Sequence, residues 1–383
     1  MRKVLYVSGT RADFGLMAST LSRIAEHPEL SLQLVVTGMH LSESYGFTVR
    51  EIEAAGFPIV ARVPIDVEGR TPQSMAKGVG EAVIGLTRAI ADARPDLVLV
   101  LGDRGEMLAA AIAAIHLGIP IVHLHGGERS GTVDESIRHA ITKLSHWHFV
   151  ATEESRERVI RLGERPEHVW ITGAPSLDNL TDLAARPRNE VLNTLRLPID
   201  ARFVLVLFHP VVQEISSIQD QVQALIGALA DVLPGRASHV VWLAPNADAG
   251  SAEILRALEA DAGGVVGLPV VLLTHLPRPQ FVAATKHAMA LMGNSSAGII
   301  EAASLGTPVV NIGNRQHARE RNTNTIDCTA DRALIAAALL QALEHGPCLP
   351  ANRYGDGHAG ERIVELLATL PIAPDLLDKV NTY

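Results

Sequence analysis

Short apolar runs recur along the first half of the chain, and segments long enough for helices separate them. The runs lie at residues 4–7, 32–36, 59–65, 97–101, 119–124, 148–151 and 169–171. Between the first two runs, Phe14, Met17, Leu21 and Ile24 keep the spacing of an apolar helix face. Strands that alternate with helices in this way form a parallel sheet. The pattern therefore predicts an α/β protein with a Rossmann-like start.

The alternation breaks near residues 172–175, and the charged stretch 182–188 carries no strand signal. It resumes with apolar runs at residues 203–208, 239–243, 270–273, 287–292 and 308–312. A chain of 383 residues exceeds what one hydrophobic core usually supports. We therefore expect two domains, with the boundary near residue 175.

The stretch 123–139 concentrates acids and histidines at the end of one predicted strand. It closes an apolar run, passes through two glycines and continues in a helix-compatible pattern. The carboxyl ends of parallel strands face the ligand crevice of an open sheet, so His125, Glu128, Asp134 and His139 should lie near that crevice. Such a concentration is typical of proton-transfer chemistry.

Two other interpretations of this stretch stay open. Asp134 and Glu135 also fit the first turn of a helix, where acids favour the positive end of the helix dipole. A metal site is the third interpretation, because two pairs of histidines repeat the i, i+2 spacing of ligand pairs. These pairs are His123 with His125, and His146 with His148.

Polar residues follow other predicted strands as well. Asp103 and Arg104 come after the run 97–101, and His40 follows the second run. Arg11 lies in the turn after the first run, where an arginine can reach a phosphate or simply lie on the surface. That turn is not G-x-G-x-x-G, so the sequence gives no support for NAD binding.

The second half contains a glycine- and serine-rich turn at residues 293–298, between an apolar run and a helix-compatible segment. Its amides and hydroxyls would suit a diphosphate, and Glu301, one turn later, could accept hydrogen bonds from ribose hydroxyls. The alternative is an ordinary serine cap followed by a helix acid.

Composition limits the partners. The formal net charge of −9 and a pI near 6.0 argue against nucleic acid, which requires a basic surface. Two cysteines are too few for a disulfide framework, and no signal peptide or long apolar run opens the chain. We therefore expect a cytoplasmic protein with no membrane partner.

Six segments, in this order, resemble the hydrolysing UDP-N-acetylglucosamine 2-epimerases of sialic- and legionaminic-acid synthesis. They are residues 9–13, 102–104, 125–128, 134–143, 293–296 and 311–316. The resemblance implies a GT-B architecture, with two Rossmann-like parallel-sheet domains facing a central cleft. These would be an N-terminal domain at 1–175, a UDP-binding domain at 176–358 and a C-terminal helix at 359–383 that returns to the first domain. It also implies a homodimer or homotetramer.

The resemblance also assigns a reaction and a site. The reaction would be elimination of UDP from UDP-N-acetylglucosamine, or from its 2,4-diacetamido-2,4,6-trideoxy analogue, followed by hydration, without metal or cofactor. A glycosyltransferase and a nucleotide-sugar sensor are the remote alternatives. The expected catalytic residues are Asp103, Glu128, Asp134 and His209. The expected substrate-binding residues are Arg11, His40, Arg104, His125, Glu135, His148, Asn246, Leu276, Gly293, Asn294, Ser295, Ser296, Glu301 and Arg315.

Overall fold

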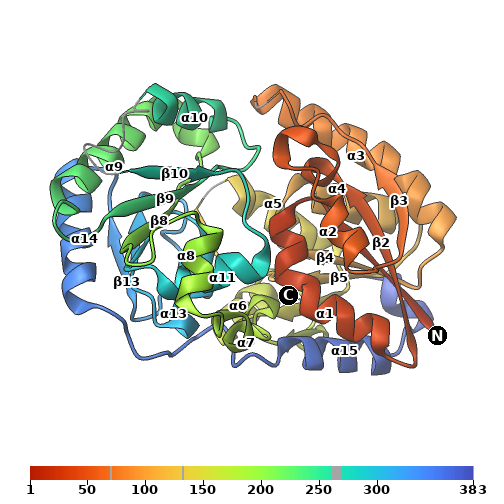
Figure 1. The fold of residues 1–383 in the computed structure, drawn as a ribbon. Coiled ribbons are helices and arrows are strands. Elements are labelled where there is room, and N and C mark those ends of the chain that lie inside the picture. Colours follow the sequence, from red (N-terminus) through yellow and green to blue (C-terminus); the bar gives the residue numbers. More distant parts are fainter. Residues whose placement is uncertain (70, 132, 261–268, 383) are drawn as a thin grey trace. The chain divides into compact units, whose positions relative to one another are not determined.

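The computed structural model describes residues 1–69, 71–131, 133–260 and 269–382. Its chain forms two compact units (Figure 1). Unit 1 comprises Met1–Glu128, Val133–Asp178 and Tyr354–Tyr383, and unit 2 comprises Arg129–Thr132 and Asn179–Arg353. The last segment of the chain therefore belongs to the same unit as the first.

Unit 1 is built on a seven-stranded parallel sheet in the order β3-β2-β1-β4-β5-β6-β7. From β1 the chain first adds β2 and β3 toward one edge of the sheet, and β4 to β7 then extend it toward the other edge. The strand order therefore reverses between β1 and β4. Ligands bind at such points in open sheets. The strands are β1 (Arg2–Ser8), β2 (Leu30–Thr37), β3 (Ile59–Val63), β4 (Leu97–Leu101), β5 (Ile121–Leu124), β6 (Trp147–Val150) and β7 (Val169–Ile171).

Helices cover both faces of this sheet. Val4 and Tyr6 of β1 pack in one apolar cluster with α1 and α15, whereas Leu5 and Val7 pack in the other with α3, α4 and α5. This alternation follows from the two-residue period of a strand. Figure 1 shows α15 running beside α1. The helices are α1 (Arg11–Glu26), α2 (Val49–Ala54), α3 (Pro72–Ala93), α4 (Gly105–His116), α5 (Val133–Leu144), α6 (Glu153–Arg161) and α15 (Ala359–Thr369).

Unit 2 repeats the plan with a six-stranded parallel sheet in the order β10-β9-β8-β11-β12-β13. The strands are β8 (Phe203–Leu207), β9 (His239–Leu243), β10 (Val270–Leu273), β11 (Leu291–Gly293), β12 (Val309–Ile312) and β13 (Thr325–Cys328). The helices are α7 (Leu180–Ala184), α8 (Arg188–Thr194), α9 (Ile218–Val232), α10 (Ser251–Ala260), α11 (Arg278–His287), α12 (Ser296–Ile300), α13 (Ala302–Leu305) and α14 (Arg332–His345).

The structure confirms the predicted α/β class with two Rossmann-like parallel-sheet domains. Two details differ from the apolar pattern. The run 287–292 is not all strand, because α11 continues to His287 and the Ala288 N–H still bonds to the Ala284 carbonyl. The strand β13 was not predicted, since its sequence is half polar and it lies at the edge of the sheet. Among the described helices, none has the length and apolar character needed to cross a lipid bilayer.

Candidate active site

The turn after β1 is held by a buried carboxylate, Asp13. Its Oδ2 accepts from the Thr10 N–H at 2.6 Å, while the Thr10 hydroxyl accepts from the Asp13 N–H at 3.2 Å, which forms a capping box at the start of α1. Asp13 also accepts from the Ser8 hydroxyl. Asp13 is not one of the predicted site residues, although its spacing from Thr10 is that of a capping box.

His40 joins this turn to the one after β2. Its Nε2 lies 2.9 Å from Ser8 Oγ and its Nδ1 lies 2.8 Å from Thr48 Oγ1. Because the Ser8 hydroxyl donates to Asp13, it accepts from Nε2, and Nδ1 accepts from Thr48. Burial lowers the pKa of His40, which favours this neutral form. Burial likewise lowers the pKa of Arg11, against the attraction of Glu51.

Arg138 connects the turns after β4 and β5. It projects from α5 and is only 1% exposed. Its guanidinium forms an ion pair with the Asp103 carboxylate and donates to the Glu128 carbonyl at 2.9 Å. Arg104 lies beside the same turn, with its Nε 3.5 Å from a carboxylate oxygen of Glu106. The structure thus brings Asp103 and the Glu128 backbone to one buried cation.

Glu128 and His125 form a pair within the β5 turn. The Nδ1 atom of His125 lies 2.5 Å from Glu128 Oε1, and both side chains are largely buried. His125 has a φ of +62°, a conformation that non-glycine residues adopt rarely. Asp134 and Glu135 are half-buried in the first turn of α5, so their positions suit both a helix acid and a reacting group.

Three further histidines of unit 1, His123, His146 and His148, are buried in or next to the strands β5 and β6. His148 is fully buried, its Nε2 donates to Glu164 at 2.9 Å, and burial lowers its pKa to about 4. His123, its neighbour on β5, is also fully buried. His146 accepts from the Ile121 N–H at 3.1 Å. Within the described part of the chain, no three His, Cys, Asp or Glu side chains form a cluster suited to a metal ion.

In unit 2, Asn294 fastens the turn after β11 to the end of β8. Its Oδ1 accepts from the His209 N–H at 2.7 Å and its Nδ2 donates to the His209 carbonyl at 2.8 Å. Arg315 donates to the Asn294 carbonyl at 3.1 Å, and the Asn246 N–H donates to His209 Nδ1 at 3.3 Å. Four predicted residues therefore meet in one hydrogen-bonded group.

Gly293 is required at the start of the same turn. It has a φ of +128°, and a Cβ added there would lie 1.9 Å from the Leu207 carbonyl oxygen. Ser295 caps the five-residue α12, with its Oγ accepting from the Ala297 N–H at 3.4 Å. Ser296 follows as the first residue of that helix, half-buried.

Glu301 lies where α12 ends and α13 begins, so the helix expected there is interrupted. Its carboxylate is 5% exposed and pairs with the Arg278 guanidinium, a partner that the sequence did not reveal. Leu276, just before α11, is half-buried against the apolar cluster that contains Leu205 and Leu207. Leu276 and Arg278 thus stand on the segment that leads into α11, and Arg278 pairs with Glu301.

Comparison with known proteins identifies the family. A model of the UDP-N-acetylglucosamine 2-epimerase family matches residues 22–368. The chain belongs to this family. It is 46% identical, over the full length of both chains, to the UDP-N,N'-diacetylbacillosamine 2-epimerase (hydrolyzing) of Legionella pneumophila. It is 32% identical to the UDP-N-acetylglucosamine 2-epimerase of Neisseria meningitidis serogroup B, over 96% of this chain and 95% of the relative.

Solved structures agree on the fold of this family member. The crystal structure of a UDP-GlcNAc 2-epimerase from Neisseria meningitidis, bound to UDP-GlcNAc, superposes with a TM-score of 0.79. It covers 95% of this chain and 99% of that chain, at 21% sequence identity. The family model and the 46% identical relative confirm the family resemblance predicted from the six sequence segments.

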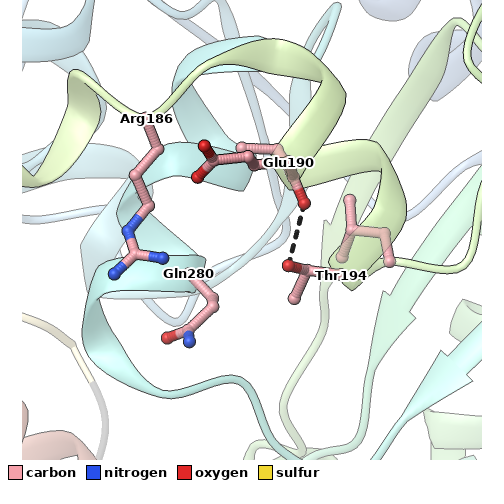
Figure 2. A pocket seen from close by; sticks show the side chains of 6 residues that line it. Arg186, Glu190, Thr194 and Gln280 are labelled. Carbon is pink, nitrogen blue, oxygen red and sulfur yellow. Dashed lines mark hydrogen bonds between the residues drawn. The ribbon is translucent and has the colours of Figure 1, made fainter.

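Unit 2 also contains a small hollow that is separate from the predicted site residues. Figure 2 shows Arg186, Glu190, Thr194 and Gln280 around it, between α8 and α11. The Thr194 hydroxyl donates to the Glu190 carbonyl at 2.9 Å. The hollow measures about 10 Å³, room for roughly one water molecule, and shares no residue with the predicted site. It does not have the size of a nucleotide site.

Proposed function

We propose that this epimerase-family chain releases UDP from a UDP-activated 2-acetamido sugar while inverting the sugar at C2. The observation that carries the proposal is the 46% identity, over both full lengths, to the Legionella enzyme named for UDP-N,N'-diacetylbacillosamine. A Campylobacter jejuni relative named for the same sugar is 34% identical over 85% of this chain. These two relatives favour the 2,4-diacetamido-2,4,6-trideoxy sugar as the substrate.

UDP-N-acetylglucosamine is the second candidate substrate. The Neisseria meningitidis relative named for that sugar is 32% identical over 96% of this chain, so the same fold accommodates it in a related enzyme. The two sugars share the 2-acetamido group and the diphosphate, and they differ at C4 and C6. Only a direct comparison of the two donors separates them.

The reaction needs an elimination before C2 can be inverted, because the C2–H bond is not activated while the diphosphate is attached. The C1–oxygen bond breaks first and its electron pair leaves on UDP, and a base then takes the C2 proton, which the positive charge developing at C1 has made acidic. Water then adds to the resulting glycal, with hydroxyl at C1 and a proton at C2. The protein must therefore supply an acid and a base, and must stabilise the departing diphosphate.

We assign the proton transfers to residues of unit 1. Asp103 is bound to Arg138, a permanent cation, whereas Glu128 is bound to His125, whose ring can hold or release a proton. Two carboxylates in such different surroundings suit different roles, as acid-base enzymes require. Asp134 is the third candidate, from the first turn of α5.

We assign the nucleotide to residues of unit 2. Arg315 and His209, both bound to Asn294, stand beside the amides of residues 293–296 and would stabilise the diphosphate. Glu301 would accept hydrogen bonds from the ribose hydroxyls. Arg278 fixes the Glu301 carboxylate in place.

The test is to incubate the enzyme with each UDP-sugar in turn, in deuterium oxide and in water labelled with oxygen-18. We expect UDP and a free C2-inverted sugar that carries deuterium at C2 and the oxygen label at C1. A product with unchanged configuration and hydrogen at C2 would contradict the proposal and indicate simple hydrolysis. UDP release that requires an added sugar acceptor would indicate a glycosyltransferase.

A further inference from the structure

His123 is a buried histidine with no place in the reaction just proposed, yet it touches three segments that carry candidate acids. Its Nε2 lies 2.8 Å from the carbonyl of Gly102, the residue before Asp103. Its Nδ1 lies 3.1 Å from Thr142 Oγ1 on α5, the helix that carries Asp134 and Arg138. A Cβ added at Gly126, in the turn of Glu128, would lie 3.0 Å from the same Nδ1.

The partners of His123 define the protonation of its ring. A carbonyl can only accept, so Nε2 carries the hydrogen and donates to Gly102. Burial, opposed by the hydrogen bond to the Gly102 carbonyl and assisted by nearby Lys379 and histidines, lowers the pKa of His123 to about 3, so the ring is neutral near pH 7. The bare Nδ1 must then accept the hydroxyl hydrogen of Thr142. The ring is therefore held in one tautomer and one orientation.

The two peptide groups on either side of Gly102 are both hydrogen-bonded to β5. The Gly102 N–H donates to the Leu124 carbonyl at 2.9 Å, and the Gly102 carbonyl accepts from the His123 ring. Gly102 has a φ of +77°, so it makes the sharp turn that directs the next residue out of the strand. The direction of the Asp103 side chain thus depends on how these peptide groups are oriented.

We propose that His123 is a positioning residue: its Nε2–H, oriented by the Thr142 hydroxyl, fixes the Gly102 peptide and through it the Asp103 carboxylate. The inference rests on the proposed function, because it takes Asp103 as an acid-base group. A shift of about 1 Å in a reacting group can cost roughly a hundredfold in rate. His123 would therefore affect turnover without touching the substrate or UDP.

The test is a double-mutant cycle between His123→Leu and Asp103→Asn, which isolates the interaction between the two sites. Turnover is measured as single-turnover UDP release, divided by the number of UDP-binding sites, so that misfolded protein does not count. We expect His123→Leu to lower this rate by about 10- to 100-fold with an unchanged Kd for UDP. In the Asp103→Asn background, His123→Leu should lower the rate of UDP release by less than about twofold, since the carboxylate that His123 positions is already gone.

A second pair of variants, at Thr142, tests the same interaction in case His123→Leu does not fold. Thr142→Val removes the hydroxyl at similar volume and should lower the single-turnover rate. Thr142→Ser keeps the hydroxyl and should retain the wild-type rate. His146→Asn is the control for replacing a buried histidine, because His146 contacts the Ile121 N–H at the start of β5 and not the turns at its end. This control should keep full turnover.

Two results would overturn the role of His123. One is an equal loss of turnover in both Asp103 backgrounds, which would show that His123 acts elsewhere. The other is full turnover in both His123→Leu and Thr142→Val. Failure of the proposed function looks different, because the wild-type chain would then release no UDP from either sugar, or Asp103→Asn alone would leave the rate unchanged.

Discussion

His146 offers a direct test of how burial lowers the pKa of a histidine in unit 1 and so makes the stability of the fold depend on pH. It stands immediately before β6, where its N–H donates to the Ile121 carbonyl at 2.9 Å and its Nδ1 accepts from the Ile121 N–H at 3.1 Å. Burial, followed by the charges of Lys379 and His148, lowers its pKa from 6.5 to about 4. An asparagine at this position removes the titration, and its Oδ1 can still accept from Ile121.

The sign of the effect follows from proton binding. Between pH 6.5 and pH 4 the unfolded chain protonates His146 and the folded chain does not, so the stability present above pH 6.5 is lost as the pH falls toward 4. One proton is worth about 1.4 kcal/mol per pH unit. Between pH 7 and pH 5 the wild-type chain should therefore lose about 1 to 2 kcal/mol more unfolding free energy than His146→Asn.

Urea unfolding at pH 7, 6 and 5, followed by tryptophan fluorescence and circular dichroism, measures this difference. The variant is first checked for an unchanged Kd for UDP at pH 7, so that the two folded states are comparable. If both proteins lose the same free energy between pH 7 and pH 5, His146 does not remain neutral in the folded chain, and the reasoning from burial is wrong.

Three further changes probe the assigned site. Asp134→Asn should lower turnover about a hundredfold with UDP affinity intact if Asp134 takes part in proton transfer; normal turnover with a slightly lower Tm would make it a helix acid only. Glu301→Gln should raise the Kd for UDP roughly tenfold or more, measured by calorimetry, because a charge-assisted hydrogen bond is worth about 1.5 to 3 kcal/mol. Gly293→Ala should abolish UDP binding and lower the Tm, since its Cβ would clash with the Leu207 carbonyl; an unchanged Tm would contradict that geometry.

The strands could be predicted wherever they are buried on both faces. β4 is the clearest case, because its five residues are all buried and all apolar, and the predicted run coincides with the observed strand. β13 lies at the edge of its sheet, and its residues Thr325–Cys328 are half-buried or exposed. An edge strand needs no continuous apolar run, so the pattern that revealed β4 carried no signal for β13.

The fold also explains which parts of the site could be predicted. Parallel strands place their carboxyl ends at one edge, so the positions of Asp103 and Glu128 directly after apolar runs were enough to place both residues at that edge of the sheet. His148 shows the opposite case. The resemblance places it among the substrate-binding residues, and the structure shows that its side chain is fully buried and bonds to Glu164, a residue 16 positions away that the sequence pattern did not connect to it.

Arg138 shows why the partners of the acids could not be predicted from the sequence pattern. It lies 35 positions from Asp103, on a helix whose apolar spacing gives no reason to expect a buried cation. Arginines are almost never fully buried unless they are paired. Once α5 packs beside β5, the guanidinium reaches both Asp103 and the Glu128 carbonyl, and burying it is favourable only because both acceptors are there. The acids and Arg138 therefore depend on one another, and the sequence shows the acids while only the fold shows the cation between them.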